Sequence, residues 1–415
     1  MISKPIKQVV VVGAGPAGML AALAAAQRGA TVSVCEKLDH PGVKLLATGG
    51  GRCNLTNTLP AEQFMAAFGR SGRFIQPALA ALDATALRGL LDSLGVPTVC
   101  GDGFNVYPAS NKAITVQSAL WRRCRESDVA LQFATQVTAL RVAEGRVAGL
   151  ETSAGPLEAD AVVLAAGGRS YPALGGSTSG YELAASVGHT LVPPTPALVP
   201  LVTRRRWPGR LAGLSLAGRV RIDLPGRPRG GIVGDILFTH HGLSGPAVLD
   251  LSGDVAALLT AGRPVPLRVN FAPDTTAEDW LARMEQWRAA RGAKRVVNLL
   301  AEALPASLAE ALCGEAGISR GVTASQLPAA KRRALAGMIA AAPLEIVRTE
   351  GWDKAMVTRG GVSLKEVDPR TLASRVVGGL HLAGEMLDLD GPSGGFNLQW
   401  AFSSGHLAGA SAAAY

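Results

Sequence analysis

A short glycine-rich segment constrains the fold of this chain more than any other feature. The segment Gly13–Gly18 reads Gly-Ala-Gly-Pro-Ala-Gly and directly follows the β-branched run Val9–Val12. A strand that ends in such a turn and continues as a helix, here over residues 17–27, begins a βαβ unit. A second strand is predicted over residues 31–35. The sequence therefore predicts a Rossmann-like α/β fold.

The residues of this turn have separate physical roles. Gly13 permits the tight turn, Gly15 lets the backbone approach a pyrophosphate, and Gly18 lets the helix pack closely on the strand. The helix begins at Pro16, and the backbone N–H groups that follow, from Ala17 on, are available to the phosphates. We therefore assign a dinucleotide to this turn.

An acidic residue follows the second predicted strand. Glu36 lies 18 residues after Gly18, where a carboxylate accepts hydrogen bonds from ribose hydroxyls. This position favours FAD or NAD over NADP, whose ribose carries a phosphate.

Composition excludes several classes of protein. In this chain of 415 residues, 48% are hydrophobic and 18% are charged, so a packed core is expected rather than disorder. The 50 glycines and 25 prolines show no Gly-X-Y period, which excludes collagen. Five cysteines without a Cys-x-x-Cys pair argue against a disulfide framework or a zinc site.

The stretch from Gln8 to Gln27 contains no charged residue and is long enough to cross a membrane. The glycine turn inside it fits a strand and a helix better than one continuous span. We expect a cytoplasmic protein with no membrane span and no bound metal.

A second glycine-rich motif covers residues 42–57. Its three consecutive glycines expose backbone N–H groups, its two basic residues add positive charge, and its threonine and asparagines add hydrogen bonds. This is a plausible lining for a diphosphate and the edge of a flavin ring. For Cys53 we favour packing over redox chemistry, because no second cysteine is near. The candidates in this motif are Lys44, Thr48, Gly49, Gly50, Arg52, Cys53 and Asn54.

Two later motifs have the same character. A buried strand over residues 161–165 ends in Gly167-Gly168, and another predicted strand ends at Gly384, where carboxylates follow that could hold ribityl hydroxyls. Gly394-Gly395 then opens the final helix, whose N-terminus could face the flavin and stabilise its anionic reduced form. The candidates are Ala165, Ala166, Gly167, Gly384, Glu385, Asp388, Gly394, Gly395, Phe396, Asn397 and Leu398, and we add Lys37 and Val137.

The local composition of the sequence changes along the chain, from a glycine-rich part to a region of short strands and then to a helical region. Four prolines between residues 193 and 200 mark the start of a region of short strands, predicted over residues 219–224, 235–239 and 266–271. Helices follow over residues 277–290, 296–304, 307–316 and 329–341, the first opened by a capping box of Thr275 and Glu278. Earlier in the chain, residues 132–142 and 146–152 are predicted to pair as two strands.

These motifs together resemble the BaiN/YhiN-type flavoproteins, the aminoacetone oxidase family of FAD-binding enzymes or NAD(P)/FAD-dependent oxidoreductases. The likeness covers residues 9–409 and is most specific over residues 44–57, 165–180, 237–246, 357–362 and 383–405. It implies non-covalent FAD in a Rossmann-like domain with an inserted β-rich subdomain and a helical subdomain. The predicted boundaries are 1–190 and 356–415 for the FAD-binding domain, 191–274 with 343–355 for the β-rich subdomain, and 275–342 for the helical one. A more distant likeness is to flavoproteins of the fumarate reductase class.

The candidates for proton transfer are His240, His241 and Tyr171. The two histidines precede Gly242 at a predicted strand end, and Tyr171 follows the Gly167-Gly168 turn. The alternative is that one histidine binds backbone and the other faces solvent.

We expect an FAD-dependent oxidoreductase that moves a hydride between flavin N5 and a small organic substrate. It would reduce an activated C=C bond with NAD(P)H as a transient donor, or oxidise an aminoketone-like amine.

An arginine-rich stretch leaves a different class of function open. The net charge is +9, and eight arginines with one aspartate between Thr203 and Gly230 contribute +7 of it. Such a stretch is either a solvated face or a surface for a polyanion. Since no aromatic residues suited to base stacking interleave it, nucleic acid is the less favoured partner. An FAD-binding RNA-modification or RNA-associated protein and a non-catalytic flavin sensor remain alternatives, and the oligomeric state is open.

Overall fold

The computed structural model describes residues 6–101 and 103–414, which form two compact units. Residues 6–196 together with 355–414 make the first unit, and residues 197–354 make the second. The second unit is thus inserted into the chain of the first.

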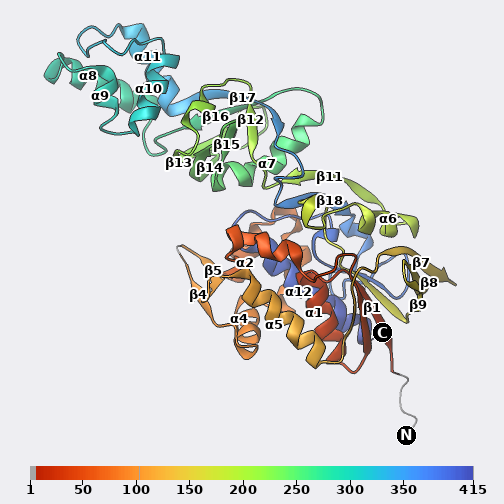
Figure 1. The fold of residues 1–415 in the computed structure, drawn as a ribbon. Coiled ribbons are helices and arrows are strands. Elements are labelled where there is room, and N and C mark those ends of the chain that lie inside the picture. The colour runs from red at the N-terminus through yellow and green to blue at the C-terminus, as the bar shows by residue number, and fades with distance from the viewer. Residues whose placement is uncertain (1–5, 102, 415) are drawn as a thin grey trace. The chain divides into compact units, whose positions relative to one another are not determined.

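A parallel sheet forms the centre of the first unit (Figure 1). It has five strands in the order β19-β10-β1-β2-β6, and each neighbouring pair is parallel. The strands are β1 (Gln8–Val12), β2 (Thr31–Cys35), β6 (Ala130–Gln132), β10 (Ala161–Leu164) and β19 (Leu380–Leu382). Burial on both faces accounts for the continuous apolar runs of β1 and β10. The predicted Rossmann-like sheet is confirmed, and its β19 comes from the far end of the sequence.

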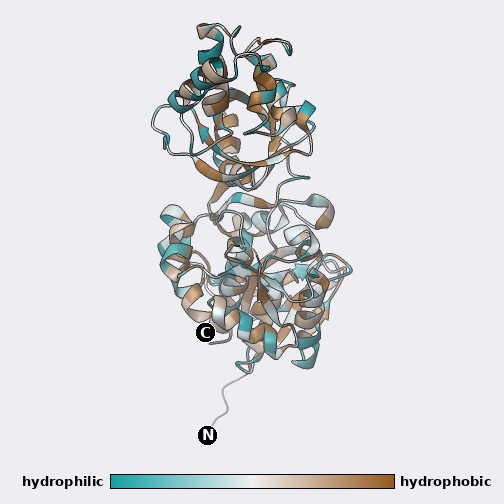
Figure 2. Cartoon of the chain, turned by 90° about the vertical axis from the view of Figure 1, so that its left-hand side faces the viewer, coloured by the Kyte–Doolittle hydropathy of each residue, from teal (hydrophilic) through white to brown (hydrophobic). Residues whose placement is uncertain are grey.

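Helices α1 (Pro16–Ala26) and α12 (Phe396–Ala414) pack against each other beside this sheet. Gly405 and Gly409 make the contact possible, because a Cβ at either position would overlap the carbonyl oxygen of Ala17 or Ala21. Both helices are rich in small residues and lack Asp, Glu, Lys and Arg. Figure 2 shows the hydropathy of the residues along the whole ribbon, with hydrophobic residues in brown.

Smaller elements surround the sheet of the first unit. Antiparallel sheets have the orders β3-β5-β4 and β7-β8-β9, and β11 pairs with β18. Their strands are β3 (Thr56–Asn57), β4 (Thr98–Cys100), β5 (Asn105–Pro108), β7 (Val137–Ala143), β8 (Arg146–Thr152), β9 (Gly155–Glu158), β11 (Leu191–Ala197) and β18 (Val357–Val362). The remaining helices are α2 (Ala61–Ala66), α3 (Gly72–Ala81), α4 (Ala84–Ser93), α5 (Ala113–Glu126) and α6 (Ser179–Ser186).

One predicted strand is really two. The expected strand over residues 132–142 is split into β6, which joins the parallel sheet, and β7, which pairs with β8. Ala134 between them has a φ of 50°, a left-handed conformation that interrupts an extended strand.

The second unit is built on a closed barrel with the strand order β12-β15-β14-β13-β16-β17. Its strands are β12 (Leu201–Thr203), β13 (Ser215–Ile222), β14 (Ile232–Phe238), β15 (Gly242–Ser244), β16 (Val265–Asn270) and β17 (Ala342–Thr349). The helices are α7 (Pro246–Leu259), α8 (Ala277–Ala290), α9 (Val296–Leu300), α10 (Ala306–Glu315) and α11 (Ala329–Ala341). One apolar core joins the barrel to these helices.

The predicted capping box of α8 was placed wrongly. The box consists of Thr276 and Asp279, which bond each other's backbone N–H groups. Thr276 stands directly before the first helical residue, Ala277, which is where an N-cap must lie, whereas Thr275 is one position too early.

No helix in the described part of the chain is both long and apolar enough to cross a membrane.

The same substitution should have opposite effects at two helical glycines. Gly409 lies in the contact between α1 and α12, whereas Gly89 lies outside it, in α4. Gly409→Ala should lower the free energy of unfolding by about 1–3 kcal/mol, because the new Cβ overlaps Ala21. Gly89→Ala in α4 should raise it by roughly 0.5–1 kcal/mol, because its Cβ meets no atom within 4 Å. Urea unfolding followed by circular dichroism measures both, and an unchanged midpoint for Gly409→Ala would show that the helices are not in backbone contact.

Buried His381 of β19 predicts acid sensitivity. Desolvation lowers the pKa of this imidazole to about 4, so protons bind the unfolded chain more readily than the folded one. The contribution of His381 to the free energy of unfolding is therefore complete above pH 6.5. It is lost as the pH falls towards 4, and the loss from this group is at most about 3 kcal/mol. Urea midpoints at pH 7 and 4.5 should differ less for His381→Leu than for the wild type, and an equal difference would contradict the assignment.

Candidate active site

A cavity runs along the carboxyl edge of the parallel sheet. Residues that follow each of the five strands line it, so it crosses the whole width of the sheet. In sheet order these residues are Val137 after β6, Glu36 after β2, Gly13 after β1, Ala165 after β10 and Gly384 after β19. Strands lie about 4.8 Å apart, which makes five strands about 19 Å wide, and this suits an extended dinucleotide. For the FAD that the sequence predicts, this arrangement would put the adenosine half over β2 and β6 and the flavin over β10 and β19, and we call these parts of the cavity the adenosine end and the flavin end.

The middle of the cavity provides a phosphate site. Gly13 has a φ of 100°, and a Cβ there would lie 2.6 Å from the carbonyl oxygen of Ala165. Helix α1 starts at Pro16 after Gly15, and no described side chain caps its N-terminus. A Cβ at Gly15 would meet no atom within 4 Å. The unpaired N–H groups therefore face open space, which fits a pyrophosphate.

Gly18 has a packing role only. A Cβ there would overlap the carbonyl oxygen of Gly13, and Gly18 does not line the cavity. The predicted packing of helix on strand explains this glycine without any cofactor contact.

The backbone holds Glu36 at the adenosine end. Its Oε2 accepts from the Ala14 N–H at 2.7 Å, and its Oε1 accepts from the Leu38 N–H at 2.9 Å. Each carboxylate oxygen can accept a further hydrogen bond, so the side chain fits ribose hydroxyls. Beside it, Lys37 donates to Ser177 at 2.7 Å, and desolvation lowers the pKa of its ammonium group.

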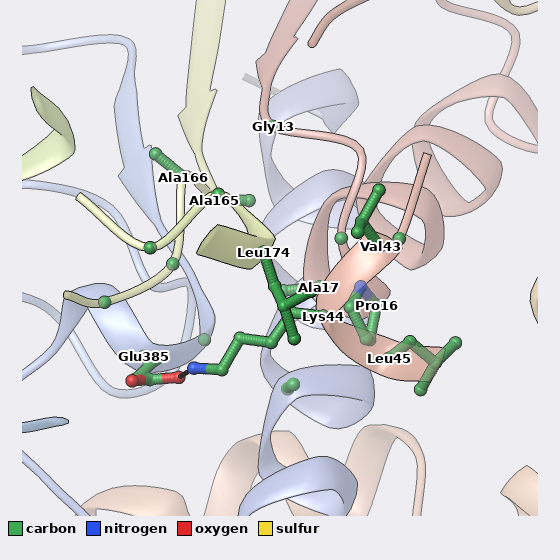
Figure 3. A pocket seen from close by; sticks show the side chains of 18 of the residues that line it. Gly13, Pro16, Ala17, Val43, Lys44, Leu45, Ala165, Ala166, Leu174 and Glu385 are labelled. Carbon is green, nitrogen blue, oxygen red and sulfur yellow. Dashed lines mark hydrogen bonds and ion pairs between the residues drawn. The ribbon is translucent and has the colours of Figure 1, made fainter. Parts of the chain in front are cut away.

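A charged network lies at the flavin end (Figure 3). Lys44 Nζ lies 2.6 Å from Glu385 Oε2 and 2.5 Å from the hydroxyl of Ser170. Ser170 donates to Glu385 Oε1 at 2.9 Å, and the Thr358 N–H donates to the same oxygen at 2.8 Å. The network therefore joins segments from three distant parts of the sequence and fixes the Lys44 ammonium in the cavity.

Sequence reasoning missed Ser170 and Thr358. Both lie in segments of high family likeness, residues 165–180 and 357–362, which was the only signal that could have pointed to them. Nothing in their residue types marks them as partners of Lys44 or Glu385.

The start of α12 forms a wall of the flavin end. Asn397 and Leu398 line the cavity. The amide of Asn397 is used to shape the preceding loop, because it accepts from the Gly391 N–H and donates to the carbonyl oxygen of Gly391, both at 2.8 Å. Trp400 donates to the carbonyl oxygen of Gly384 at 3.1 Å, which ties the helix to the end of β19.

The structure brings most of the predicted cofactor residues together. Those that line the cavity are Gly13, Gly15, Pro16, Ala17, Glu36, Lys37, Lys44, Thr48, Val137, Ala165, Ala166, Gly167, Gly384, Glu385, Asn397 and Leu398. The others do not line it, namely Gly18, Gly49, Gly50, Arg52, Cys53, Asn54, Asp388, Gly394, Gly395 and Phe396.

Physical reasons account for several residues of the second group. Cys53 is fully buried, and desolvation raises the pKa of its thiol to about 12, which fits packing rather than redox chemistry. Gly394 packs against Phe104, and Gly395 packs against the backbone of Thr56. Arg52 is exposed.

The candidates for proton transfer do not line the cavity either. Tyr171 is partly buried with a φ of 53°, and desolvation raises the pKa of its hydroxyl. His240 and His241 are exposed and belong to the second unit, between β14 and β15, while the cavity is lined by residues of the first unit.

Comparisons with known proteins match nearly the whole chain. Residues 7–411 match the model of the family described as HI0933-like protein Rossmann domain. The chain is 34% identical over 406 residues to a 3-dehydro-bile acid delta(4,6)-reductase of Clostridium scindens, covering 97% of this chain and 98% of that one. It is 31% identical over 401 residues to a ribosomal RNA dihydrouridine synthase of Escherichia coli, covering 95% of each. The family resemblance of the sequence is confirmed.

Solved structures show the same fold at low identity. A flavocytochrome c3 fumarate reductase in its open conformation matches with a TM-score of 0.52 and 17% identity, over 99% of this chain and 78% of that one. The 3-ketosteroid-delta4-(5alpha)-dehydrogenase of Rhodococcus jostii, in complex with 4-androstene-3,17-dione, matches with a TM-score of 0.53 and 17% identity, over 100% and 98%.

The open space at Gly15 predicts a variant that folds but loses its cofactor. Gly15→Leu should abolish retention of FAD, because its side chain occupies the phosphate site, while the urea midpoint of the flavin-free protein changes little. Gly230→Leu is the matched control, since a Cβ there also meets no atom within 4 Å and this residue lies outside the cavity. The ratio of visible to ultraviolet absorbance after gel filtration measures retention, and a yellow Gly15→Leu protein would refute the phosphate site.

Proposed function

This chain belongs to the HI0933-like Rossmann family of FAD-dependent oxidoreductases, and we propose that it reduces a carbon–carbon double bond conjugated to a carbonyl group. One observation carries the proposal. Two relatives with more than 30% identity over nearly their whole length are named for unrelated substrates but for the same type of change. A 3-oxo steroid with unsaturation at positions 4 and 6, and a uridine that becomes dihydrouridine, both lose a double bond conjugated to a carbonyl group.

The cavity provides what such a reaction requires of the protein. Bound FAD supplies a hydride at its ring nitrogen N5. Gly15 and the start of α1 fit its pyrophosphate, and Glu36 fits its adenosine ribose. Lys44, held by Glu385 and Ser170, places a fixed positive charge at the flavin end. A preorganised charge there favours a reduced, anionic ring.

We propose that a nicotinamide, NADH or NADPH, delivers the electrons. The sequence carries one Gly-x-Gly-x-x-Gly fingerprint after a strand, at Gly13, and no second convincing one. The nicotinamide would therefore dock transiently near the flavin end rather than in a domain of its own. Oxidation of an aminoketone-like amine, with O₂ as acceptor, is the competing reaction, and the experiment below separates the two.

The second unit favours uridine in RNA as a specific substrate. Within the described residues, Arg204 pairs with Glu345 at 2.9 Å and Arg205 with Glu315 at 2.7 Å. Within the arginine-rich stretch 203–230, the exposed arginines without an ion pair to a described residue are Arg206, Arg210 and Arg229. Exposed guanidinium groups of this kind suit RNA phosphates, and their contribution to binding falls with salt.

Two anaerobic half-reactions test the proposal. We expect NADH or NADPH to bleach the flavin of the purified holoprotein. A 3-oxo-4,6-diene steroid, or ribosomal RNA from cells that lack this gene, should then restore the oxidised spectrum. Mass spectrometry should show the acceptor, steroid or uridine, heavier by two hydrogens.

Three outcomes separate the alternatives. Reoxidation by RNA alone, weakened by Arg206→Ala, Arg210→Ala and Arg229→Ala together, would select uridine as the substrate. Reoxidation by the steroid alone would select a free enone. Reduction by an aminoketone and reoxidation by O₂ only would contradict the proposal.

A further inference from the structure

Arg52 is held in place at the surface, four residues along the chain from Thr48, which lines the cavity. Its Nε donates to the carbonyl oxygen of Gly49 at 3.2 Å, and its guanidinium carbon lies 4.9 Å from the centre of the Tyr107 ring. These two contacts fix the plane of the guanidinium group. Neither Nη atom makes a hydrogen bond or an ion pair to a described residue. The group is therefore oriented by the protein and still has donors to offer.

The turn that carries Arg52 begins in the cavity wall. Thr48 lines the cavity, and its carbonyl oxygen accepts from the Cys53 N–H at 3.0 Å, which closes the turn. The segment Val43–Gly51, which includes Lys44 of the charged network, leads directly into it. Arg52 is thus tied by a short, closed turn to the end of the cavity assigned to the flavin.

Two glycines shape the turn that carries Arg52. A Cβ at Gly49 would lie 3.0 Å from the backbone nitrogen of Asn54 and 3.6 Å from the Tyr107 ring, and its φ is 57°. A Cβ at Gly50, whose φ is 66°, would meet nothing within 4 Å. Gly49 therefore lets the turn close against Asn54 and Tyr107, and the position of Gly50 is open.

The same wall continues to the start of α12. Tyr107 belongs to β5, and the neighbouring Asn105 lies 3.4 Å from where a Cβ of Gly394 would be. Phe104 packs on Gly394 from the same strand end. Strand β5 therefore connects the Arg52 turn with the helix whose first turn lines the flavin end.

We propose that Arg52 is a substrate-binding catalytic residue that donates to the carbonyl oxygen of the conjugated substrate, and that Tyr107 is the positioning residue that orients it. This inference rests on the proposed function, and it assigns Arg52 to the substrate rather than to FAD. The substrate class follows from the chemistry: a flat, conjugated carbonyl compound, which can lie beside a guanidinium plane and accept its hydrogen bonds.

The reaction explains why a cation is needed at this atom. A hydride, which reduced FAD would supply by cleavage of its N5–H bond, forms a bond to the carbon β to the carbonyl. The electron pair of the C=C bond moves to the α-carbon–carbonyl bond, and the carbonyl π-electrons move onto oxygen. The resulting enolate oxygen carries a full negative charge, which Arg52 stabilises. A proton from water then bonds to the α-carbon and the C=O bond reforms. NAD(P)H would supply the two electrons for each turnover.

Anaerobic stopped-flow kinetics on the two half-reactions test this assignment. Arg52→Met should retain FAD and should be reduced by NADPH at the wild-type rate. Its reoxidation by a saturating 3-oxo-4,6-diene steroid, or by ribosomal RNA if that is the acceptor, should be about 100- to 1000-fold slower. Arg283→Met is the matched control, because Arg283 lies 5.2 Å over the ring of Trp280 in α8 and should leave both half-reactions unchanged.

Variants of Tyr107 test its positioning role. Tyr107→Leu removes the ring and should slow only reoxidation, by roughly 10-fold, whereas Tyr107→Phe retains the ring and should restore most of the rate. A defect in Tyr107→Phe as large as that in Tyr107→Leu would overturn the positioning role.

The same measurements distinguish an error in the role of Arg52 from an error in the proposed reaction. A wild-type protein that no conjugated carbonyl compound reoxidises would refute the proposed function. A wild-type protein that is reoxidised, beside an Arg52→Met variant that is reoxidised as fast, would refute the role of Arg52 alone. Loss of FAD or of reduction by NADPH in Arg52→Met would also overturn it, by making Arg52 a cofactor ligand.

Discussion

The backbone contact between helices α1 and α12 is the constraint on which the rest of the first unit depends. Because Gly405 and Gly409 have no side chains, the last helix of the chain lies directly on Ala17 and Ala21 of the first. This contact places the C-terminal segment beside β1 and β10, where β19 completes the parallel sheet. A side chain at either glycine would separate the two ends of the sequence from which the cavity is made.

The cavity is a consequence of this two-part assembly. The adenosine end is built from the first part of the chain, around Glu36 and Val137, whereas the flavin end needs Glu385 and the start of α12. Lys44 and Glu385 are 341 positions apart and lie in direct contact. The second unit, with its barrel and helices, is inserted in the chain between these two parts. The insertion does not interrupt the cavity, because both parts contribute strand ends to the same edge of the parallel sheet.

Local patterns explain which features could be predicted from the sequence. The fingerprint at Gly13 and the β-branched runs around it depend on short-range sterics, so β2 was predicted with its observed bounds and β1 was predicted to end at Val12, as observed. The closure of the barrel depends on the pairing of β12 with β15 and β17, between strands far apart in sequence, and no local pattern reveals it.

In the site too, local sequence patterns predict some features, and others depend on tertiary contacts. Residue type alone grouped Lys44 and Arg52 as phosphate or flavin contacts because both are basic and lie in one motif. The structure places Lys44 in the cavity and Arg52 outside it over Tyr107, a difference that depends on how the turn after Thr48 is closed. The partners Ser170 and Thr358 could not be predicted either, because their importance comes only from a tertiary contact with Glu385.

The central claim is that one cavity spans all five strand ends and holds both halves of a dinucleotide. Titration of the flavin-free protein with FAD and with FMN, followed by flavin fluorescence, tests it most directly. The structure predicts one FAD per chain and affinity for FMN weaker by roughly 100-fold or more, because FMN lacks the adenosine half that lies over β2 and β6. Equal affinity for the two flavins would contradict the claim, because the adenosine end would then contribute nothing to binding.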